Sequence, residues 1–388
     1  MKILSVNAGS SSLKFQVYQM PEERVIASGI FERIGIEGSL YTFKTDEKVK
    51  KNIEINNHEE AVNILIDELM EKKVVSDLNE IEAVGHRVVH GADKYSDSVI
   101  ITDEVLSDVE EFSALAPLHN PANISGIKAF KKAIPNALMV AVFDTAFHQT
   151  IDKEEFLYAV PYEWYTDLKI RKYGFHGTSH KYLAKRASEL NLEKVIICHL
   201  GNGGSLSAVK DGKCIDTTMG FTPNAGIIMG TRSGDIDATI IEHVMEKTEK
   251  TFSEVMNDLN KKSGLLGLSG FSSDSRDIEE AVEKGNERAI LAHNKFVKAI
   301  AGYIAKYYVL LEGADAIIFS AGIGENSALV RKDILSSLHI LGIEIDEDAN
   351  NTRGEEKEIT TSNSKVKAFI IPTDEELMIV KETYKLIK

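Results

Sequence analysis

The sequence predicts an α/β protein built from two similar halves. At 388 residues the chain is too long for a single hydrophobic core, so we expect two domains. Two segments, 3–17 and 195–209, share one pattern: an apolar run, a turn rich in Gly, Ser and Asn, and a second alternating run. Strand-like and helix-like segments alternate along the chain, which is typical of a sheet flanked by helices in each half.

The two matching segments each predict a β-hairpin with a tight loop. Glycine allows close approach to the backbone, and successive N–H groups form a concavity that suits phosphate. Gly/Ser turns also close many ordinary hairpins, so one such loop alone is weak evidence. A pair of them, one opening each half, favours two lobes that hold a polyphosphate.

The other elements are predicted from the spacing of apolar residues. In the first half we expect strands at 24–30, 40–44, 83–89 and 137–143, and helices at 58–70, 103–116 and 123–133. In the second half we expect helices near 235–247 and at 288–311 and 375–387, and strands at 315–320 and 366–371. The acidic stretch 346–358 is predicted to be a solvated loop.

The composition limits the classes of partner. A formal net charge of -15 argues against nucleic acid or an anionic membrane, although a few local arginines can still bind a small anion. No apolar run approaches the roughly 20 residues that span a bilayer, and the start of the chain turns polar too early for a secretory signal. The only cysteines, Cys198 and Cys214, fit a reduced setting. We therefore expect a soluble cytoplasmic protein.

Three familiar kinds of site are not expected. The sequence has no G-x-x-x-x-G-K-[ST] loop, which excludes a P-loop enzyme, and the segment 201–204 lacks the spacing of a dinucleotide fingerprint. His176 and His180 are four residues apart, as in some metal sites. Gly177 disfavours a regular helix start there, however, and no carboxylate lies between the two histidines. Zinc is therefore not expected.

Polar residues follow several predicted strands and turns, where functional sites commonly form. Arg87 and His90 close one strand, Asp144 follows another, and Arg232 lies in a Gly-flanked turn. Each has a structural alternative, such as a pairing carboxylate for Arg87 or a helix cap for Asp144. His119, between two prolines, is by itself more typical of a stiff turn. Together with the two loops, these residues favour phosphoryl transfer, in which catalysis is positioning and charge neutralisation.

A series of motifs runs from the first strand to the closing helix: Val6–Phe15, Gly85–Gly91, Ala116–Pro121, Val142–Gln149, Tyr173–His180, His199–Gly204, Met229–Asp237 and Ala321–Asn326. In this order they resemble the acetokinase family of the sugar-kinase, Hsp70 and actin superfamily. The resemblance implies two actin-like, ribonuclease H-like lobes with an internal duplication. Residues 1–144 and 376–388 would form the N-terminal lobe, and residues 145–375 would form the C-terminal lobe, with most of the nucleotide site. A homodimer is also implied.

The resemblance implies roles in catalysis and acceptor binding. The catalytic residues would be Asp144, His176, Arg232 and Arg87, with His119 close by. His176 would donate to the oxygens of the transferred group. Arg87 would also bind the acetate carboxylate, and the methyl group would lie in a small apolar pocket of Val89, Leu118, Phe175 and Pro223.

The resemblance also implies the cofactor site. Mg²⁺, with Mn²⁺ as a substitute, would be placed by Asn7 and Glu375. The phosphates of ATP or ADP would be held by Ser12, Lys14, His199, Leu200, Gly201, Asn202 and Gly203. Adenosine would be held by Asp274, Ser275, Arg276, Gly322, Ile323, Gly324, Glu325 and Asn326.

The implied reaction is reversible in-line phosphoryl transfer from ATP to acetate, which gives ADP and acetyl phosphate. A carboxylate is already an anion at pH 7 and needs no general base. Asp144 is therefore expected to orient an arginine or a metal-bound water. The alternatives are a kinase that prefers propionate or butyrate, a pyrophosphate-dependent acetate kinase, and a non-enzymatic nucleotide-switched binding protein of the same fold. The arginines and histidines argue against the last of these.

Two departures from the family pattern lie near these residues. Residues 223–226 read Pro-Asn-Ala-Gly where Pro-Leu-Glu-Gly is expected, and Ala92 stands where a second glycine is expected after Gly91. Neither removes a residue with an expected chemical role. The first lies near Arg232 and could change the rigidity of the chain there.

Overall fold

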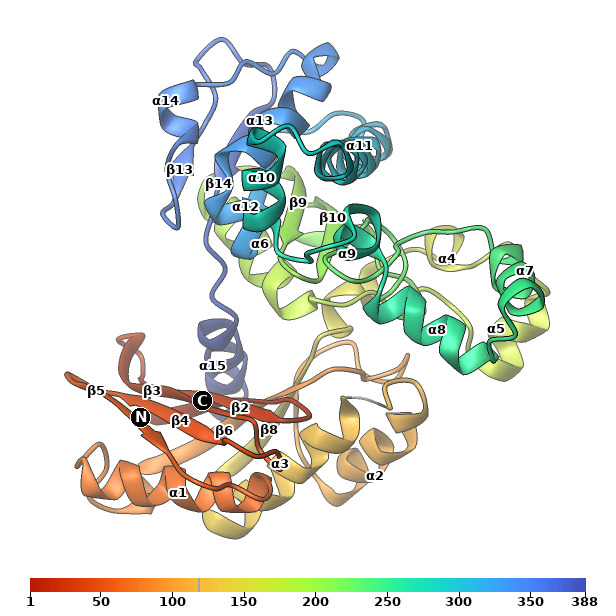
Figure 1. Cartoon of the computed structure of the whole chain (residues 1–388). Helices are drawn as coiled ribbons and strands as arrows, with labels where there is room; N and C mark the ends of the chain where they lie inside the picture. Colours follow the sequence, from red (N-terminus) through yellow and green to blue (C-terminus); the bar gives the residue numbers. More distant parts are fainter. Residues whose placement is uncertain (118) are drawn as a thin grey trace. The chain divides into compact units, whose positions relative to one another are not determined.

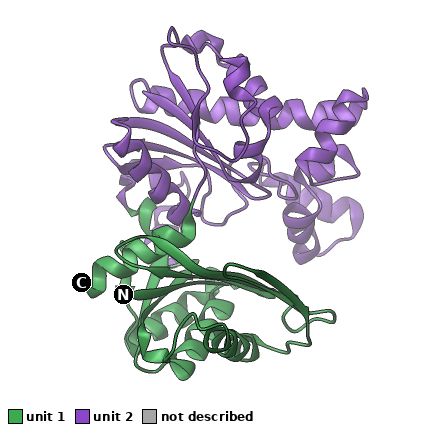
Figure 2. Ribbon diagram, turned by 90° about the vertical axis from the view of Figure 1, so that its left-hand side faces the viewer, with its two compact units in different colours: residues 1–149, 374–388 green, residues 150–373 purple. Residues whose placement is uncertain are grey.

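The computed structural model describes residues 1–117 and 119–388, which divide into two compact units (Figures 1 and 2). Unit 1 comprises Met1–Gln149 and Asp374–Lys388, and unit 2 comprises Thr150–Thr373. The lobes expected from the sequence, 1–144 with 376–388 and 145–375, differ from these units at residues 145–149 and at Asp374 and Glu375, all of which lie in unit 1. Within the described residues, no helix is long and apolar enough to cross a membrane.

Unit 1 contains a mixed sheet of eight strands in the order β5-β4-β3-β2-β1-β6-β8-β7. Its strands are β1 (Lys2–Ala8), β2 (Ser12–Gln19), β3 (Arg24–Glu32), β4 (Leu40–Lys44), β5 (Lys48–Asn52), β6 (Ile81–Val88), β7 (Val99–Ile100) and β8 (Leu138–Phe143). Its helices are α1 (His58–Glu71), α2 (Asp103–Glu111), α3 (Asn120–Ala133) and α15 (Glu375–Ile387). Strands β1 to β5 form an antiparallel meander, and β6 and β8 extend it in parallel from β1.

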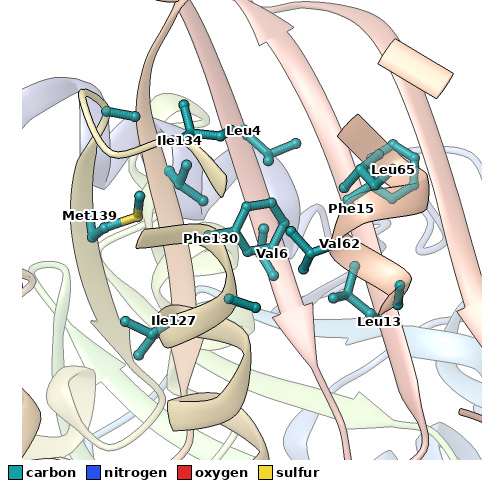
Figure 3. Close-up of a cluster of buried hydrophobic side chains, with 14 of the residues drawn as sticks. Leu4, Val6, Leu13, Phe15, Val62, Leu65, Ile127, Phe130, Ile134 and Met139 are labelled. Atoms are coloured by element: carbon teal, nitrogen blue, oxygen red, sulfur yellow. The ribbon is translucent and has the colours of Figure 1, made fainter. Parts of the chain in front are cut away.

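Alternate residues of the strands in unit 1 supply the core on one face of the sheet. Side chains from β1, β2 and β8 pack against the apolar faces of α1 and α3 (Figure 3). The cluster in Figure 3 includes Leu4, Val6, Leu13, Phe15, Val62, Leu65, Ile127, Phe130, Ile134 and Met139. The predicted hairpin 3–17 and the helix predicted at 58–70 are thus both present and share one core.

Helix α15 packs on β6 and β8, where Ile379 contacts Val140 and Val142. A Cβ atom on Gly85 would lie 2.7 Å from Ile379 Cγ2 and closer still to Thr383 Oγ1. Glycine at position 85 is therefore what lets the helix approach β6.

Unit 2 contains a mixed sheet of six strands in the order β11-β10-β9-β12-β14-β13. The strands are β9 (Lys194–Leu200), β10 (Gly204–Lys210), β11 (Lys213–Thr217), β12 (Ala316–Ser320), β13 (Lys357–Glu358) and β14 (Lys367–Ile370). The helices are α4 (Lys153–Phe156), α5 (Tyr162–Leu168), α6 (Gly177–Glu189), α7 (Thr239–Thr248), α8 (Phe252–Lys261), α9 (Gly264–Ser269), α10 (Ser275–Glu283), α11 (Glu287–Leu310), α12 (Ala321–Asn326), α13 (Ala328–Ser337) and α14 (Glu347–Asn350). The long helix α11 covers the core on one face of the sheet.

The two sheets share a topology. In unit 1 the order β3-β2-β1-β6-β8 corresponds to β11-β10-β9-β12-β14 in unit 2. Each series is an antiparallel meander of three strands followed by two parallel strands. The predicted α/β fold, with a mixed sheet flanked by helices in each half, is confirmed.

Two predicted elements differ from the structure. The helix predicted at 103–116 ends at Glu111, and a short 3₁₀ helix at Phe112–Ala114 follows it. The acidic stretch 346–358 contains α14 and β13, and β13 pairs with β14 at the edge of the sheet. The prediction of a plain solvated loop was therefore wrong. Charged side chains are common on edge strands as well as in solvated loops, so the abundance of acidic residues could not distinguish an edge strand from a loop.

Candidate active site

In unit 1 the predicted polar residues meet at one end of the sheet. Asn7 and Lys14 are direct cross-strand neighbours on β1 and β2. Arg87 is the next-to-last residue of β6, and Asp144 directly follows β8. Because β1, β6 and β8 are parallel, their carboxyl ends lie at the same edge of the sheet, where α/β proteins commonly bind ligands.

Arg87 is the centre of this cluster. Its Nε donates to Asp144 Oδ2 at 2.9 Å, its Nη2 donates to the same oxygen, and its Nη1 donates to Asn7 Oδ1 at 3.2 Å. Burial alone would lower the pKa of Arg87, but the charges of Asp144 and Glu375 outweigh burial and raise it above its usual value. A guanidinium has five N–H groups. Three are used in these bonds, so two on the terminal nitrogens have no partner among the described residues and can bind a ligand.

The first turn of α15 adds acidic side chains to the cluster. Burial raises the pKa of Glu375 to about 7; Arg87 opposes this shift, and Asp144 and Glu376 add to it. Glu376 Oε1 lies 2.5 Å from Lys14 Nζ. At full ionisation, three carboxylates here face two cations, so the cluster favours a further cation.

The segment after β6 is held by two buried asparagines that were not predicted from the sequence. Asn123 Oδ1 accepts from Val89 N at 3.1 Å, and its Nδ2 donates to Ala8 O at 2.8 Å. Asn120 exchanges two hydrogen bonds of 3.1 Å with the backbone of His90. Both lie in the first turn of α3, so this turn fixes the end of β6.

Two other residues predicted for the acceptor site lie in or beside this region. Val89 is buried after β6, and His119 is half-buried directly before α3. Leu118, also predicted for the acceptor, lies outside the described residues. Ser12, predicted for the phosphates, begins β2, and its carbonyl accepts from Gly9 N at 2.8 Å across the predicted loop.

In unit 2 two predicted residues, Arg232 and His176, converge above the hairpin loop 201–203. A Cβ atom placed on Gly203 would lie 3.4 Å from Arg232 Nη1 and 3.8 Å from His176 Nε2. The loop is hydrogen-bonded to the turn that carries Arg232, since Gly230 N donates to Asn202 O at 2.9 Å. Both side chains are therefore directed at the space over Gly203.

Arg232 differs from Arg87 in its partners. Its Nη1 donates to Pro223 O at 3.1 Å, and within the described part of the chain it forms no ion pair with a carboxylate. Burial lowers the pKa of Arg232 from its usual value. A partly buried guanidinium without a counter-charge is stabilised by an anion that enters beside it.

His176 precedes α6 with a left-handed backbone, at φ 58°. Such a conformation is uncommon for a residue with a side chain and is often found at functional sites. The His176 ring stacks on His199, with centroids 4.3 Å apart, and His176 Nδ1 lies 2.9 Å from Ser205 Oγ. His199 Nδ1 in turn lies 2.8 Å from Ser179 Oγ. Phe175 is buried directly before His176.

Most of the residues predicted to hold adenosine line a cavity of about 930 Å³ in unit 2. Its lining includes these predicted residues: Gly201, Asn202, Asp274, Ser275, Arg276, Gly322, Ile323 and Asn326. It also includes residues that were not predicted: Ser273, Glu279, Glu280, Glu283, Ser327 and Arg353. Arg353 lies within the acidic stretch 346–358 that was predicted to be a loop, and its place in the cavity wall follows only from the fold.

Leu200, Gly324 and Glu325 are among the predicted cofactor residues that do not line this cavity. Leu200 packs in the core on the α11 side of the sheet. Glu325 Oε1 accepts from Ala321 N at 2.7 Å and so closes the turn of α12. Gly324 O accepts from Nη1 of the buried Arg331 at 2.8 Å. Leu200 is thus a core residue, and Glu325 and Gly324 support the cavity wall from behind.

The unusual segment 223–226 is rigidly held. Asp235 Oδ1 accepts from Gly226 N at 2.8 Å, and Asp235 N donates to Gly226 O at 2.9 Å. Gly226 has a φ of 95°, which favours glycine. The replacements at 224 and 225 therefore leave both anchors of the segment in place, including the Pro223 carbonyl that accepts from Arg232.

Comparison with known proteins decides the family. The model of the acetokinase family matches residues 2–381. The chain belongs to the acetokinase family. It is 56% identical to the acetate kinase of Bacillus velezensis over 391 residues, which cover 99% of each chain. It is similar in structure to Porphyromonas gingivalis acetate kinase (TM-score 0.95, 41% identity, 100% of both chains). A propionate kinase from Francisella tularensis is also similar (TM-score 0.94, 42% identity, 99% of both chains).

The acetokinase family is enzymatic, and its members are kinases. The family uses ATP and ADP, so the cavity and the cluster over Gly203 are the candidate nucleotide side of the site. Within residues 1–117 and 119–388, no group of three or more His, Cys, Asp or Glu is arranged to hold a metal ion. Mg²⁺ needs no such group, because it is commonly bound by one or two carboxylates with water and substrate phosphates.

Proposed function

We propose that this chain transfers a phosphoryl group reversibly from ATP to acetate, to give ADP and acetyl phosphate. The observation that carries the proposal is the convergence of Arg232 and His176 over Gly203. Two donors directed at one point beside a Gly-rich hairpin suit the oxygens of a phosphoryl group. Family membership and relatives named acetate kinase support the choice of acceptor.

The acceptor is assigned to unit 1. Asp144 occupies the side of the Arg87 guanidinium, and Asn7 holds one terminal nitrogen, so the remaining N–H groups can bind a carboxylate in a fork. Asp144 acts here as an orienting group, because the acceptor is already ionised at pH 7. Val89 is buried beside Arg87 and can supply apolar surface for a methyl group.

The donor is assigned to unit 2. Arg232 neutralises the charge of the transferred group, and His176 donates to an equatorial oxygen, as phosphoryl transfer requires. The 201–203 loop supplies backbone groups for the phosphates, and the 930 Å³ cavity is large enough for a nucleoside. The cytoplasm, where ATP is available, is the proposed compartment.

Mg²⁺ fits the acidic cluster of unit 1. Glu375, whose pKa burial raises to about 7, and Asn7 are oxygen donors of the kind that Mg²⁺ prefers. When bound, the ion would neutralise negative charge on the phosphates. Glu375 and Asn7 would hold it, and Mn²⁺ could take the same ligands.

The specific alternative is a propionate kinase, because a protein of that name has nearly the same fold. One added methylene changes the binding free energy by only about 1–3 kcal/mol.

Acyl phosphate formation should be measured by hydroxamate trapping with acetate, propionate and butyrate, and with ATP, GTP and pyrophosphate. Acetate with ATP should give the highest turnover, propionate less and butyrate very little. Equal or better turnover of butyrate would exclude the proposed acceptor, and activity only with pyrophosphate would exclude the donor.

A homodimer is proposed from an apolar surface on unit 2. Helices α5, α7 and α8 lie together at one end of this unit (Figure 1), and no residue of α7 is buried. Large apolar side chains are exposed there, including Trp164, Leu168, Ile240 and Phe252. Such patches on soluble proteins often mark interfaces. Light scattering after size exclusion should give twice the chain mass of 42.9 kDa. A monomer at micromolar concentration would contradict the proposal.

A further inference from the structure

A chain of buried polar side chains lies behind His176. Ser205 Oγ is 2.9 Å from His176 Nδ1 and 2.8 Å from His180 Nε2, and Ser207 Oγ is 2.7 Å from His180 Nδ1. Ser205, Ser207 and His180 are all 0% exposed. The serines are alternate residues of β10 and project from the same face of the sheet. His180 lies on α6, one helical turn beyond His176.

The protons in this chain are linked, because each contact needs one donor and one acceptor. A serine hydroxyl has one proton, and a neutral imidazole has one N–H. In one direction, Ser207 donates to His180 Nδ1, His180 Nε2 donates to Ser205, and Ser205 donates to His176 Nδ1. In the reverse direction, every one of these bonds is inverted, and His176 Nδ1 donates to Ser205.

Ser207 distinguishes the two directions. Among the described residues, its hydroxyl has His180 Nδ1 as its one hydrogen-bond partner. In the reverse direction Ser207 accepts from His180, and its own buried proton has no acceptor. An unmatched buried donor is strongly unfavourable. The forward direction uses that proton and leaves only oxygen lone pairs unmatched.

The forward direction determines the state of His176. When Nδ1 accepts from Ser205, the single proton of the neutral imidazole must be on Nε2. Nε2 is the atom that faces the point above Gly203, close to Arg232 Nη1. A doubly protonated His176 would force the reverse direction, so the chain also disfavours the charged ring.

We propose that Ser207, His180 and Ser205 are positioning residues that set the tautomer of His176, so that a neutral ring presents Nε2–H to the transferred phosphoryl group. The identity of that group rests on the proposed function, whereas the tautomer itself does not. His176 would then donate without gaining or losing a proton during transfer, and Arg232 would supply the positive charge.

Nitrogen NMR on the full chain labelled with ¹⁵N-histidine tests this directly. The signals of His176 are assigned by their loss in His176→Gln. In the unmodified protein at pH 7.5, Nε2 of His176 should carry the proton and Nδ1 should be bare. In Ser207→Ala both tautomers should be populated, and kcat should fall about 3- to 10-fold with unchanged KM for acetate and ATP.

The matched control is Thr217→Val. Thr217 pairs directly with Ser207 across the sheet, is also buried, and donates its hydroxyl to Leu206 O at 2.9 Å. Among the described residues, its hydroxyl forms no hydrogen bond with a histidine. Thr217→Val should leave the His176 signals and kcat unchanged. This control distinguishes an effect of breaking the hydrogen bonds from Ser207 to His176 from an effect of removing any buried hydroxyl.

Each result decides the proposal. A proton on Nδ1 of His176 in the unmodified protein, alone or together with one on Nε2, overturns it even if no variant folds. His176 signals that are the same in Ser207→Ala as in the unmodified protein also overturn it. The tautomer is measured without turnover. A protein with the expected tautomer but no acetyl phosphate formation would therefore refute the proposed function and leave the positioning role standing.

Discussion

Gly203 is the residue at which the donors of unit 2 converge, and its missing side chain is part of the site. A methyl group there would lie 3.4 Å from Arg232 Nη1 and 3.8 Å from His176 Nε2, which are ordinary contact distances. The fold should therefore tolerate alanine at this position. The space for a phosphoryl group, however, would be partly filled.

Gly203→Ala should lower kcat by about 100-fold, comparable to the loss of one transition-state donor, with little change in thermal stability. Gly302→Ala is the control, because a Cβ at this position on α11 meets nothing within 4 Å. It should keep full activity. Parental kcat in Gly203→Ala would mean that the transferred group does not pass over this residue.

Ala92 illustrates a departure from the family pattern that the structure explains. Its φ is 51°, a conformation in which an L-residue is strained by roughly 1–2 kcal/mol. This is why glycine is expected at that position. Ala92 is held by its neighbours, since its N–H donates to His90 Nδ1 at 3.0 Å and its carbonyl accepts from Gln149 Nε2 at 3.2 Å.

At the scale of elements, β6 contributes a source of acid sensitivity. His86 is buried on this strand, with its ring against Phe130 and its Nε2 3.4 Å from Met139 Sδ. Burial lowers the pKa of His86 to about 3. Burial also lowers the pKa of His90, directly after the strand, to about 4.

The sign of the pH dependence follows from these shifts. An unfolded histidine binds a proton below about pH 6.5, whereas the folded rings stay neutral until pH 3–4. Stability should therefore fall as the pH drops below 6.5, by up to about 1.4 kcal/mol per pH unit for each histidine. Between pH 7 and pH 5 the Tm of His86→Leu should fall less than the Tm of the parent. His339→Leu, at an exposed position, is the control and should behave like the parent. If the Tm of His86→Leu fell as much as that of the parent, His86 would not be a source of the acid sensitivity.

The wall of the candidate nucleotide cavity depends on Arg331, which is fully buried on α13. It donates to Gly324 O at 2.8 Å, Thr352 O at 2.9 Å and Asn350 Oδ1 at 3.0 Å, and burial lowers its pKa to about 10. Arg331→Met would leave these acceptors unsatisfied and should destabilise the protein by about 2–4 kcal/mol. The exposed Arg353→Met, on the same wall, should leave Tm unchanged and raise the KM for ATP. Equal thermal stability in both variants would contradict the structural role of Arg331.

The elements differ in how far the sequence could predict them. The Arg87–Asp144 pair lies where two strand ends meet, and each strand was visible as an apolar run. The histidine and serine chain was not predicted, because Ser205 and Ser207 look like ordinary alternation on a strand. Their partners come from α6, and no local pattern shows that β10 and α6 lie together. The same limit applies to Asn120 and Asn123, whose amides are matched by backbone groups distant in sequence.

At the scale of the whole molecule, the proposed chemistry is divided between two units of related topology. Unit 1 presents a guanidinium already oriented by a carboxylate, and unit 2 presents one without a carboxylate partner in the described residues. The first suits a ligand that is bound in both ground and transition states. The second suits charge that develops during transfer. Replacing either arginine should therefore affect different kinetic constants.

Arg87→Ala should raise the KM for acetate as well as lower kcat, because the acceptor loses its fork while Asp144 loses its counter-charge. Lysine at position 87 should rescue only partly, since a point charge cannot bridge two oxygens. An unchanged KM for acetate in Arg87→Ala would place the acceptor elsewhere.

The most direct test of the central claim is steady-state acetyl phosphate formation by Arg232→Ala, with both substrates varied. We predict a fall in kcat of about 100- to 1,000-fold, with the KM for acetate and for ATP changed far less, and partial recovery on addition of guanidinium. Arg186→Ala, which removes a guanidinium paired with Glu356 in unit 2, should retain parental kinetics. A near-parental kcat in Arg232→Ala would contradict phosphoryl transfer over Gly203.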